Sequence, residues 1–212
     1  MANDFIIEGI FPIPIYSTYR NLGLNSTEKK EIKKIADHVH QHHKPEIEGW
    51  TSDLNLTMSA NTYVLDASKL KKLKEFCEQH LKVYIKQTQV RQEADFYITQ
   101  SWISVTRPGE SHFPHRHPNS MISGVFYVST IEEYKDRILF YNPNEKEEPI
   151  KIDPSPVCTY DVIDYQLILF PSWLAHGVEK NKSTKDRICI SFNTFVKGTF
   201  GSVEERNRLV LQ

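Results

Sequence analysis

The second half of the chain is a succession of short segments with the composition of β-strands. From Asp95 onward, runs rich in β-branched and aromatic residues alternate with clusters of proline, asparagine and aspartate, which is the pattern of strands separated by turns. Many short strands in succession indicate a sandwich or jelly roll, a class that includes the metal-holding cupin barrels. The expected strands are Tyr97–Thr106, Met121–Thr130, Arg137–Tyr141, Val157–Val162, Gln166–Phe170 and Arg187–Val196.

The first part of the chain has a mixed pattern. Residues 10–16 are apolar but contain two prolines, so we expect an extended segment at the edge of a sheet. Ser26 and Thr27 offer a helix cap, and residues 28–43 carry apolar side chains at helical spacing. A second helix is expected to open after Asp66. Each helix has one apolar side, so both need a sheet to cover.

Length and composition favour a single domain. The chain has 212 residues, of which 39% are hydrophobic and 25% are charged, enough for a core and without the composition of a membrane span. We expect residues 1–94 to form an N-terminal buttress of one strand and helices, residues 95–197 the double-stranded barrel core, and residues 198–212 a C-terminal tail. The fold class is therefore mainly β with flanking helices.

Charge and cysteine content indicate the setting in which the protein works. The net charge of -1 gives no basic footprint for nucleic acid, and no membrane partner is expected. The three separated cysteines Cys77, Cys158 and Cys189 do not suggest a disulfide framework. The first residues also lack the basic and apolar regions of a signal peptide. We expect a cytoplasmic location, which is a reducing compartment.

Three histidines form the candidate metal site. His115 and His117 are two residues apart on an extended segment, so their side chains point to the same face. His176 follows a predicted strand and would reach the same place from another part of the barrel. Three protein ligands that leave positions open are the arrangement of a catalytic metal. The alternative is three unrelated histidines that make structural hydrogen bonds.

The last predicted strand has one polar and one apolar face. A polar face toward the barrel interior predicts a ligand pocket, with Arg187 as a fixed cation beside the metal; the alternative is a surface strand with its polar side in water. The apolar face would pack against the helices. The polar residues are Arg187, Cys189, Ser191 and Asn193, and the apolar ones are Ile188, Ile190 and Phe192.

A second group of histidines and the tryptophans carry weaker signals. His38, His40, His42 and His43 end the first predicted helix and compete as a metal site. No carboxylate-rich partner follows them, and histidines at a helix carboxyl end interact favourably with the helix dipole. We expect these histidines to be mostly solvated. The tryptophans, at positions 50, 102 and 173, are expected to serve packing, and the last of them could line the entrance to the site.

These motifs together resemble a known family. The chain is similar to the 2-oxoglutarate/Fe(II)-dependent oxygenases of marine bacteria and the tailed phages that infect them. The resemblance implies a double-stranded β-helix that binds iron through His-x-Asp/Glu and a distal histidine, with an arginine for the far carboxylate of 2-oxoglutarate. The matching segments are residues 11–16, 101–102, 107–109, 115–120, 123–128, 169–174, 176, 187–188 and 190–193.

Carried over by position, the resemblance assigns roles to individual residues. His115 and His176 become metal ligands, Arg187 becomes the carboxylate clamp, and His117 stands where the family's carboxylate ligand usually is. A neutral third ligand leaves more positive charge on the metal, so the native metal is left open. Further assignments follow: Cys189 in place of a hydroxyl residue, Ser191 or Tyr127 assisting it, Asn193 orienting imidazole or substrate, and His112 and Glu110 as outer or solvent-facing neighbours.

The expected function is a non-haem Fe(II) and 2-oxoglutarate-dependent dioxygenase. It would use O₂ to hydroxylate an amino acid, a peptide or a small molecule, in the host cytoplasm if a phage encodes it. One alternative is a three-histidine cupin-type dioxygenase that needs no 2-oxoglutarate. The other is a non-catalytic metal-binding or phage accessory protein on the same fold. The sequence indicates neither the primary substrate nor the oligomeric state.

Overall fold

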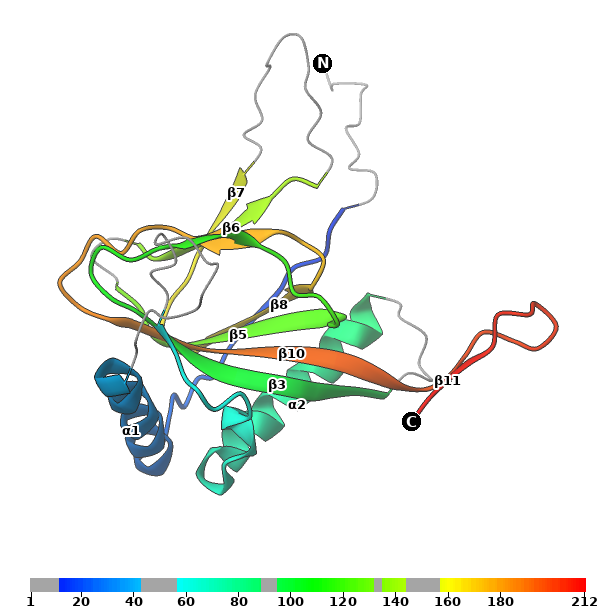
Figure 1. Cartoon of the computed structure of the whole chain (residues 1–212), viewed down its shortest axis with the longest axis horizontal. Helices are drawn as coiled ribbons and strands as arrows, with labels where there is room; N and C mark the ends of the chain where they lie inside the picture. The colour runs from blue at the N-terminus through cyan, green and yellow to red at the C-terminus, as the bar shows by residue number, and fades with distance from the viewer. Residues whose placement is uncertain (1–11, 43–56, 89–94, 132–134, 144–156) are drawn as a thin grey trace, which may run out of the picture.

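Two antiparallel sheets face each other in the computed structural model, which describes residues 12–42, 57–88, 95–131, 135–143 and 157–212 (Figure 1). The larger sheet has the order β1 (Tyr16–Tyr19), β8 (Gln166–Pro171), β5 (Ile122–Ser129), β10 (Arg187–Phe200), β3 (Asp95–Thr106) and β2 (Thr57–Met58), with β11 (Leu209–Leu211) paired to the end of β10. The smaller sheet has the order β4 (His112–His115), β9 (His176–Val178), β6 (Arg137–Tyr141) and β7 (Val157–Asp161).

The order of the strands is that of a double-stranded β-helix. From β3 to β10 the chain passes back and forth between the two sheets, with only β6 and β7 following each other in the same sheet. This winding confirms the predicted jelly-roll core. All six predicted strands are present, with ends that differ from the prediction by a few residues. The short strands β4 and β9 were not predicted, although both carry candidate metal ligands.

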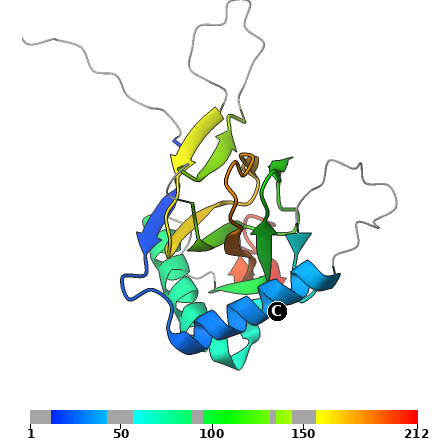
Figure 2. The ribbon, with the colours of Figure 1, turned by 90° about the vertical axis from the view of Figure 1, so that its left-hand side faces the viewer.

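The two long helices, α1 (Ser26–His42) and α2 (Lys71–Gln87), lie on the same side of the larger sheet (Figures 1 and 2). Two 3-10 turns, Val64–Asp66 and Ser68–Leu70, lead into α2. The cap of α1 is Asn25 rather than the predicted Ser26 or Thr27. Its side-chain oxygen accepts hydrogen bonds from the Thr27 and Glu28 amides, while the Glu28 carboxylate accepts one from the Asn25 amide. This reciprocal capping box satisfies amides that the helix itself cannot.

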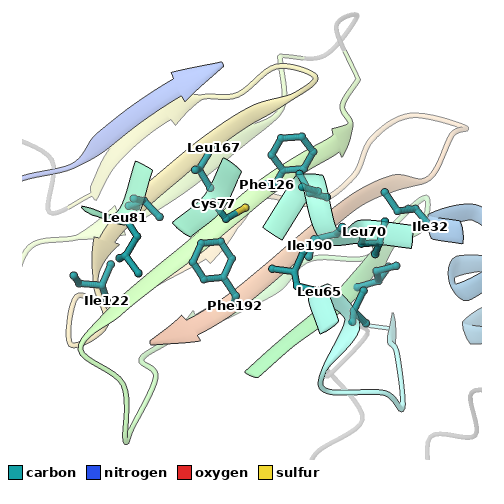
Figure 3. Close-up of a cluster of buried hydrophobic side chains, with 14 of the residues drawn as sticks. Ile32, Leu65, Leu70, Cys77, Leu81, Ile122, Phe126, Leu167, Ile190 and Phe192 are labelled. Atoms are coloured by element: carbon teal, nitrogen blue, oxygen red, sulfur yellow. The ribbon is translucent and has the colours of Figure 1, made fainter. Parts of the chain in front are cut away.

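The main core lies between these helices and the larger sheet. Figure 3 shows Phe126, Ile190 and Phe192 on the sheet meeting Cys77 and Leu81, all five of them buried. The face of β10 that carries Ile188, Ile190 and Phe192 therefore packs against the helices, as predicted. A second, smaller apolar cluster of β5, β6 and β8 side chains fills one part of the space between the two sheets. The polar face of β10 is thereby turned toward the barrel interior.

The ends of the described chain differ from expectation in detail. β1 is the edge strand of the larger sheet, but it overlaps the predicted segment at Tyr16 alone, and residues 10–11 lie outside the described residues. At the other end β10 continues to Phe200, and β11 returns along it as a hairpin in place of a plain tail. The positive φ of 69° at Gly201 and the Asn207 side chain, which accepts from the Ser202 amide, allow that return. The division into buttress, barrel and tail stays a prediction.

We expect Gly124→Ala to lower the free energy of unfolding by about 1–3 kcal/mol, because overpacking a filled core forces side chains off their preferred rotamers. Gly124 on β5 lies opposite Phe192 on β10, and a methyl group there would overlap the Phe192 ring. Urea unfolding of the purified protein measures the change. The double variant Gly124→Ala/Phe192→Leu should recover part of the lost free energy of unfolding. If Gly124→Ala and the double variant lose the same amount, this packing account is contradicted.

Candidate metal centre

Three imidazoles from two separate segments of the barrel converge on one point. His115 ends β4, His117 follows two residues later, and His176 begins β9. β4 and β9 pair in the smaller sheet with His115 directly opposite His176. One ligand nitrogen from each of the three rings lies within 4.8 Å of the other two. The structure therefore brings the three predicted residues together, while their role as metal ligands stays a prediction.

Hydrogen bonds fix the orientation of each ring. The Nδ1 atoms of His115 and His176 lie 3.1 and 3.0 Å from the backbone oxygens of Phe113 and Leu174. The Nδ1 atom of His117 lies 2.6 Å from Oδ1 of Asn193. Because oxygen acceptors require Nδ1 to carry the proton, each Nε2 keeps a free lone pair. Metal-binding histidines are oriented in this way.

The two closest nitrogens have the spacing of metal ligands. Nε2 of His115 lies 3.1 Å from Nε2 of His117. Two nitrogens on adjacent sites of an octahedral ion with bonds of about 2.1 Å are separated by about 3.0 Å. With both protons on Nδ1, no hydrogen bond joins these nitrogens, and the two lone pairs face each other. A cation is the group that relieves this arrangement, so the residues present fit a divalent metal.

Burial keeps the histidines in the neutral form that binds metal. It lowers the pKa of His115 to about 4 and that of His176 to about 2, and the neighbouring imidazoles contribute in the same direction. Burial also lowers the pKa of His117, although its hydrogen bond with Asn193 opposes the shift. All three rings are therefore neutral at pH 7, and binding a metal displaces no proton from them.

A chain of hydroxyl groups, two of them buried, supports His117. Asn193 Oδ1, which accepts from His117, also accepts a hydrogen bond from Ser123 Oγ over 3.2 Å. Ser172 Oγ lies 2.8 Å from Ser123 Oγ and 2.7 Å from Ser120 Oγ. The network joins the segment after the His-x-His motif to the start of β5, the end of β8 and the middle of β10. Asn193, predicted to orient imidazole or substrate, is engaged with imidazole.

Two further rings pack on the histidines. The His112 ring centroid is 3.9 Å from that of His115, and burial lowers the pKa of His112 to about 3. Of the two positions predicted for His112, an outer neighbour of the site or a solvent-facing residue, the structure shows the first. The Trp102 ring stacks on His117 at a centroid distance of 5.7 Å, so this packing residue touches the site. Glu110 instead accepts a hydrogen bond from the Arg107 amide in the preceding turn.

Arg187 lies at the start of β10 with its side chain 3% exposed. Its Nη1 donates a hydrogen bond of 3.1 Å to Oδ1 of Asp136. Its Nη2 is buried and has no hydrogen-bond partner among the described residues. Since a buried guanidinium donor without an acceptor is costly, this atom indicates a binding position for an anionic group.

The other predicted co-substrate residues lie along the same strands. Cys189 on β10 faces Tyr127 on β5 in the sheet register, and burial raises the pKa of both, so both remain protonated at neutral pH. Ser191 lies between Cys189 and Asn193 on the same face of β10 and is half-buried. Whether these three side chains touch a co-substrate stays a prediction.

Sequence reasoning missed Asp136. It precedes β6, belongs to no motif, and is 51 positions from its partner Arg187 in the chain. A lone aspartate before a strand is an ordinary turn residue, so no local signal distinguishes it. The competing histidines beyond His38 have side chains outside the described residues. Within the described ranges, one cluster contains at least three side chains that could bind the same metal ion: His115, His117 and His176.

Known proteins share both the motif region and the fold. Residues 100–193 match a family model described as "Putative 2OG-Fe(II) oxygenase". A comparison with curated proteins gives no match. The family-model match confirms the resemblance found in the sequence, although nothing supports the marine or phage origin.

Among the helices of the described residues, none is long and apolar enough to cross a membrane.

Several solved structures have a similar shape. The carbocyclase SnoK of nogalamycin biosynthesis superposes with a TM-score of 0.60 at 12% identity, covering 88% of this chain and 82% of that one. A prolyl hydroxylase from Trichoplax adhaerens gives 0.54 at 15% identity, covering 85% and 83%. HygX from Streptomyces hygroscopicus, solved with nickel and 2-oxoglutarate, gives 0.51 at 10% identity, covering 86% and 82%. At these identities the likeness shows the fold, a double-stranded β-helix.

We expect the metal-free protein to lose stability as the pH falls below about 6.5, the pKa of histidine in an unfolded chain. Below this pH the histidines of the unfolded chain bind protons, whereas the buried rings of the folded protein stay neutral. The free energy of unfolding therefore decreases until the pH reaches the lowered pKa values of the folded state. Between pH 6.5 and 5, His176 alone should contribute about 2 kcal/mol.

Denaturant midpoints at several pH values measure this dependence. The variant His115→Gln/His176→Gln should show a shallower slope than the wild type. An equal slope in the two proteins would contradict the account.

We also expect Asn193→Ala to weaken binding of a divalent metal by about 10- to 100-fold, the usual effect of removing the acceptor behind a ligating imidazole. Competition with a coloured chelator gives the affinity. Asn181→Ala is the matched control, because Asn181 is also buried but donates to the backbone oxygens of Thr106 and Lys185. A loss of affinity of the same size in both variants would show a general effect on folding.

Proposed function

We propose that this chain, whose residues 100–193 match the 2OG-Fe(II) oxygenase family model, uses His115, His117 and His176 to bind Fe(II) and Arg187 to bind 2-oxoglutarate. It then hydroxylates an amino acid, a peptide or a small molecule with O₂. One observation carries the proposal: a buried arginine donor without a partner occupies the same barrel interior as three oriented, neutral imidazoles. Enzyme class and cofactors are those of the matched family.

The protein's own part in this chemistry is to hold ligands in place. Bound Fe(II) supplies the activation of O₂, with 2-oxoglutarate as the source of two electrons. The three histidines provide neutral nitrogen donors whose rings are fixed by Phe113, Leu174 and Asn193. Three protein ligands leave positions for the co-substrate and oxygen. Metal binding therefore requires little rearrangement of the protein.

Arg187 supplies the second anchor. A guanidinium recognises a carboxylate by directed, charge-assisted hydrogen bonds, and these are strongest where water is excluded. Arg187 is buried, and the protonated side chains of Tyr127 and Cys189 add neutral donors on adjoining strands. No negative charge from these two residues opposes a carboxylate. Held at both ends, 2-oxoglutarate would present its keto-acid group to the metal in one orientation.

The metal ligands also favour a second candidate function. In the described part of the chain, the group of potential ligands contains three histidines and no carboxylate. This neutral set is compatible with a cupin-type dioxygenase that consumes O₂ without 2-oxoglutarate. Such an enzyme would have no use for an anion-binding arginine in its interior. The first function therefore explains the unpartnered Nη2 atom and the second leaves it without a role.

Anaerobic addition of Fe(II) and then 2-oxoglutarate to the metal-free protein should produce a visible charge-transfer band. The band should be absent in His176→Ala, which lacks a metal ligand, and should require at least tenfold more 2-oxoglutarate in Arg187→Ala, since a charge-assisted contact is lost. Absorption titration measures both effects. Arg137→Ala is the matched control, because Arg137 pairs with Asp161 and Glu179 at the surface.

Two results would count against the proposal. Well-folded wild-type protein that binds Fe(II) without the band, but consumes O₂ with a substrate, supports the cupin-type reaction. A band of undiminished affinity in Arg187→Ala would mean that the arginine does not bind the co-substrate.

A further inference from the structure

We propose that Asp136 is a positioning residue for the co-substrate: it holds one arm of the Arg187 guanidinium and leaves the other arm for the distal carboxylate of 2-oxoglutarate. The inference rests on the proposed function and adds a residue that no motif contains. It starts from the contact between Arg187 Nη1 and Asp136 Oδ1, 3.1 Å long and buried on both sides.

Asp136 is itself held firmly in place. Its second carboxylate oxygen, Oδ2, accepts a hydrogen bond of 2.8 Å from the Ile131 amide. Its backbone oxygen accepts one of 2.9 Å from the Val162 amide, next to the end of β7. These contacts fix both the main chain and the side chain of Asp136. A carboxylate held in this way serves as a rigid anchor for the arginine.

The anchor determines which part of the guanidinium is available. Arginine donors have a planar, fixed arrangement, so a bond at Nη1 also sets the direction of Nη2. Nη2 is buried and lacks a partner among the described residues. An arginine side chain otherwise has many rotamers, and fixing it before binding removes that entropic cost from co-substrate binding.

Asp136 also changes the charge of the binding position. Arg187 and Asp136 together are formally neutral, so an arriving carboxylate meets an ion pair instead of an isolated buried cation. A lone cation 3% exposed would be costly to bury, which the aspartate offsets. The contact with the ligand then depends on the direction of Nη2 more than on net charge. Selectivity for a 2-oxo acid of the right length follows from this geometry.

The test compares 2-oxoglutarate with pyruvate, which has the same keto-acid end but lacks the distal carboxylate. Calorimetry on zinc-loaded protein gives both dissociation constants, and their ratio isolates the contribution of the distal site. In Asp136→Asn this preference for 2-oxoglutarate should fall by about tenfold, with pyruvate affinity unchanged. The asparagine amide has one acceptor oxygen, whereas the aspartate has two and accepts from both Arg187 Nη1 and the Ile131 amide.

Glu28→Gln is the matched control. Glu28 on α1 is a fully buried carboxylate that accepts hydrogen bonds from Nη1 and Nη2 of Arg20. It should cost stability in the same way as Asp136→Asn and leave the preference for 2-oxoglutarate unaltered. An equal loss of preference in both variants would overturn the inference in favour of a general effect of breaking a buried pair.

The remaining outcomes are distinct. Wild-type protein without a preference for 2-oxoglutarate overturns the proposed function and the inference together. A wild-type preference that Asp136→Asn keeps or increases overturns the inference alone; an increase would mean that Asp136 competes with the ligand. If Asp136→Asn does not fold, a crystal structure of the wild-type zinc complex with 2-oxoglutarate decides. A retained Arg187–Asp136 contact supports the inference, and both arms turned to the ligand overturn it.

Discussion

The antiparallel pairing of β4 with β9 is the interaction on which the candidate site depends. These strands come from parts of the chain about sixty residues apart, and their register sets His115 directly opposite His176. A shift of one residue would turn one imidazole to the other face of the sheet. The smaller sheet holds that register because β6 pairs with β9 on its other side and places Phe140 opposite His176.

The two faces of the larger sheet have different roles: one packs in the apolar core and the other lines the candidate site. Its outer face meets α1 and α2 through a continuous apolar core, while its inner face carries Arg187, Asn193 and the serine network. Burying polar groups is costly unless they are hydrogen-bonded, and nearly all of these are. The exception among described side chains, Nη2 of Arg187, lies where a ligand is expected. The apolar core on the other face stabilises the barrel, while the interior holds the polar residues of the candidate binding site.

The long strands and the three histidines were predictable because their signals are local. Alternation along β10 separates Ile190 and Phe192 from Cys189 and Asn193, and the structure places the two sets on opposite faces. The spacing of His115 and His117 likewise follows from strand geometry. The short strands β4 and β9 were not predicted, since three or four residues with proline or glycine carry little periodicity. The cap of α1 shifted to Asn25 because Glu28 completes a box that only this position allows.

The sequence by itself determined the succession of strands, the two amphipathic helices and the set of residues able to bind a metal. Each of these depends on side chains that are neighbours in the chain, where periodicity and residue chemistry act directly. Tertiary structure alone decided that Asn193 orients His117, that Trp102 stacks on it, and that Asp136 pairs with Arg187. These contacts join residues 15 to 76 positions apart, and burial in the assembled barrel, which no local pattern records, gives them their strength.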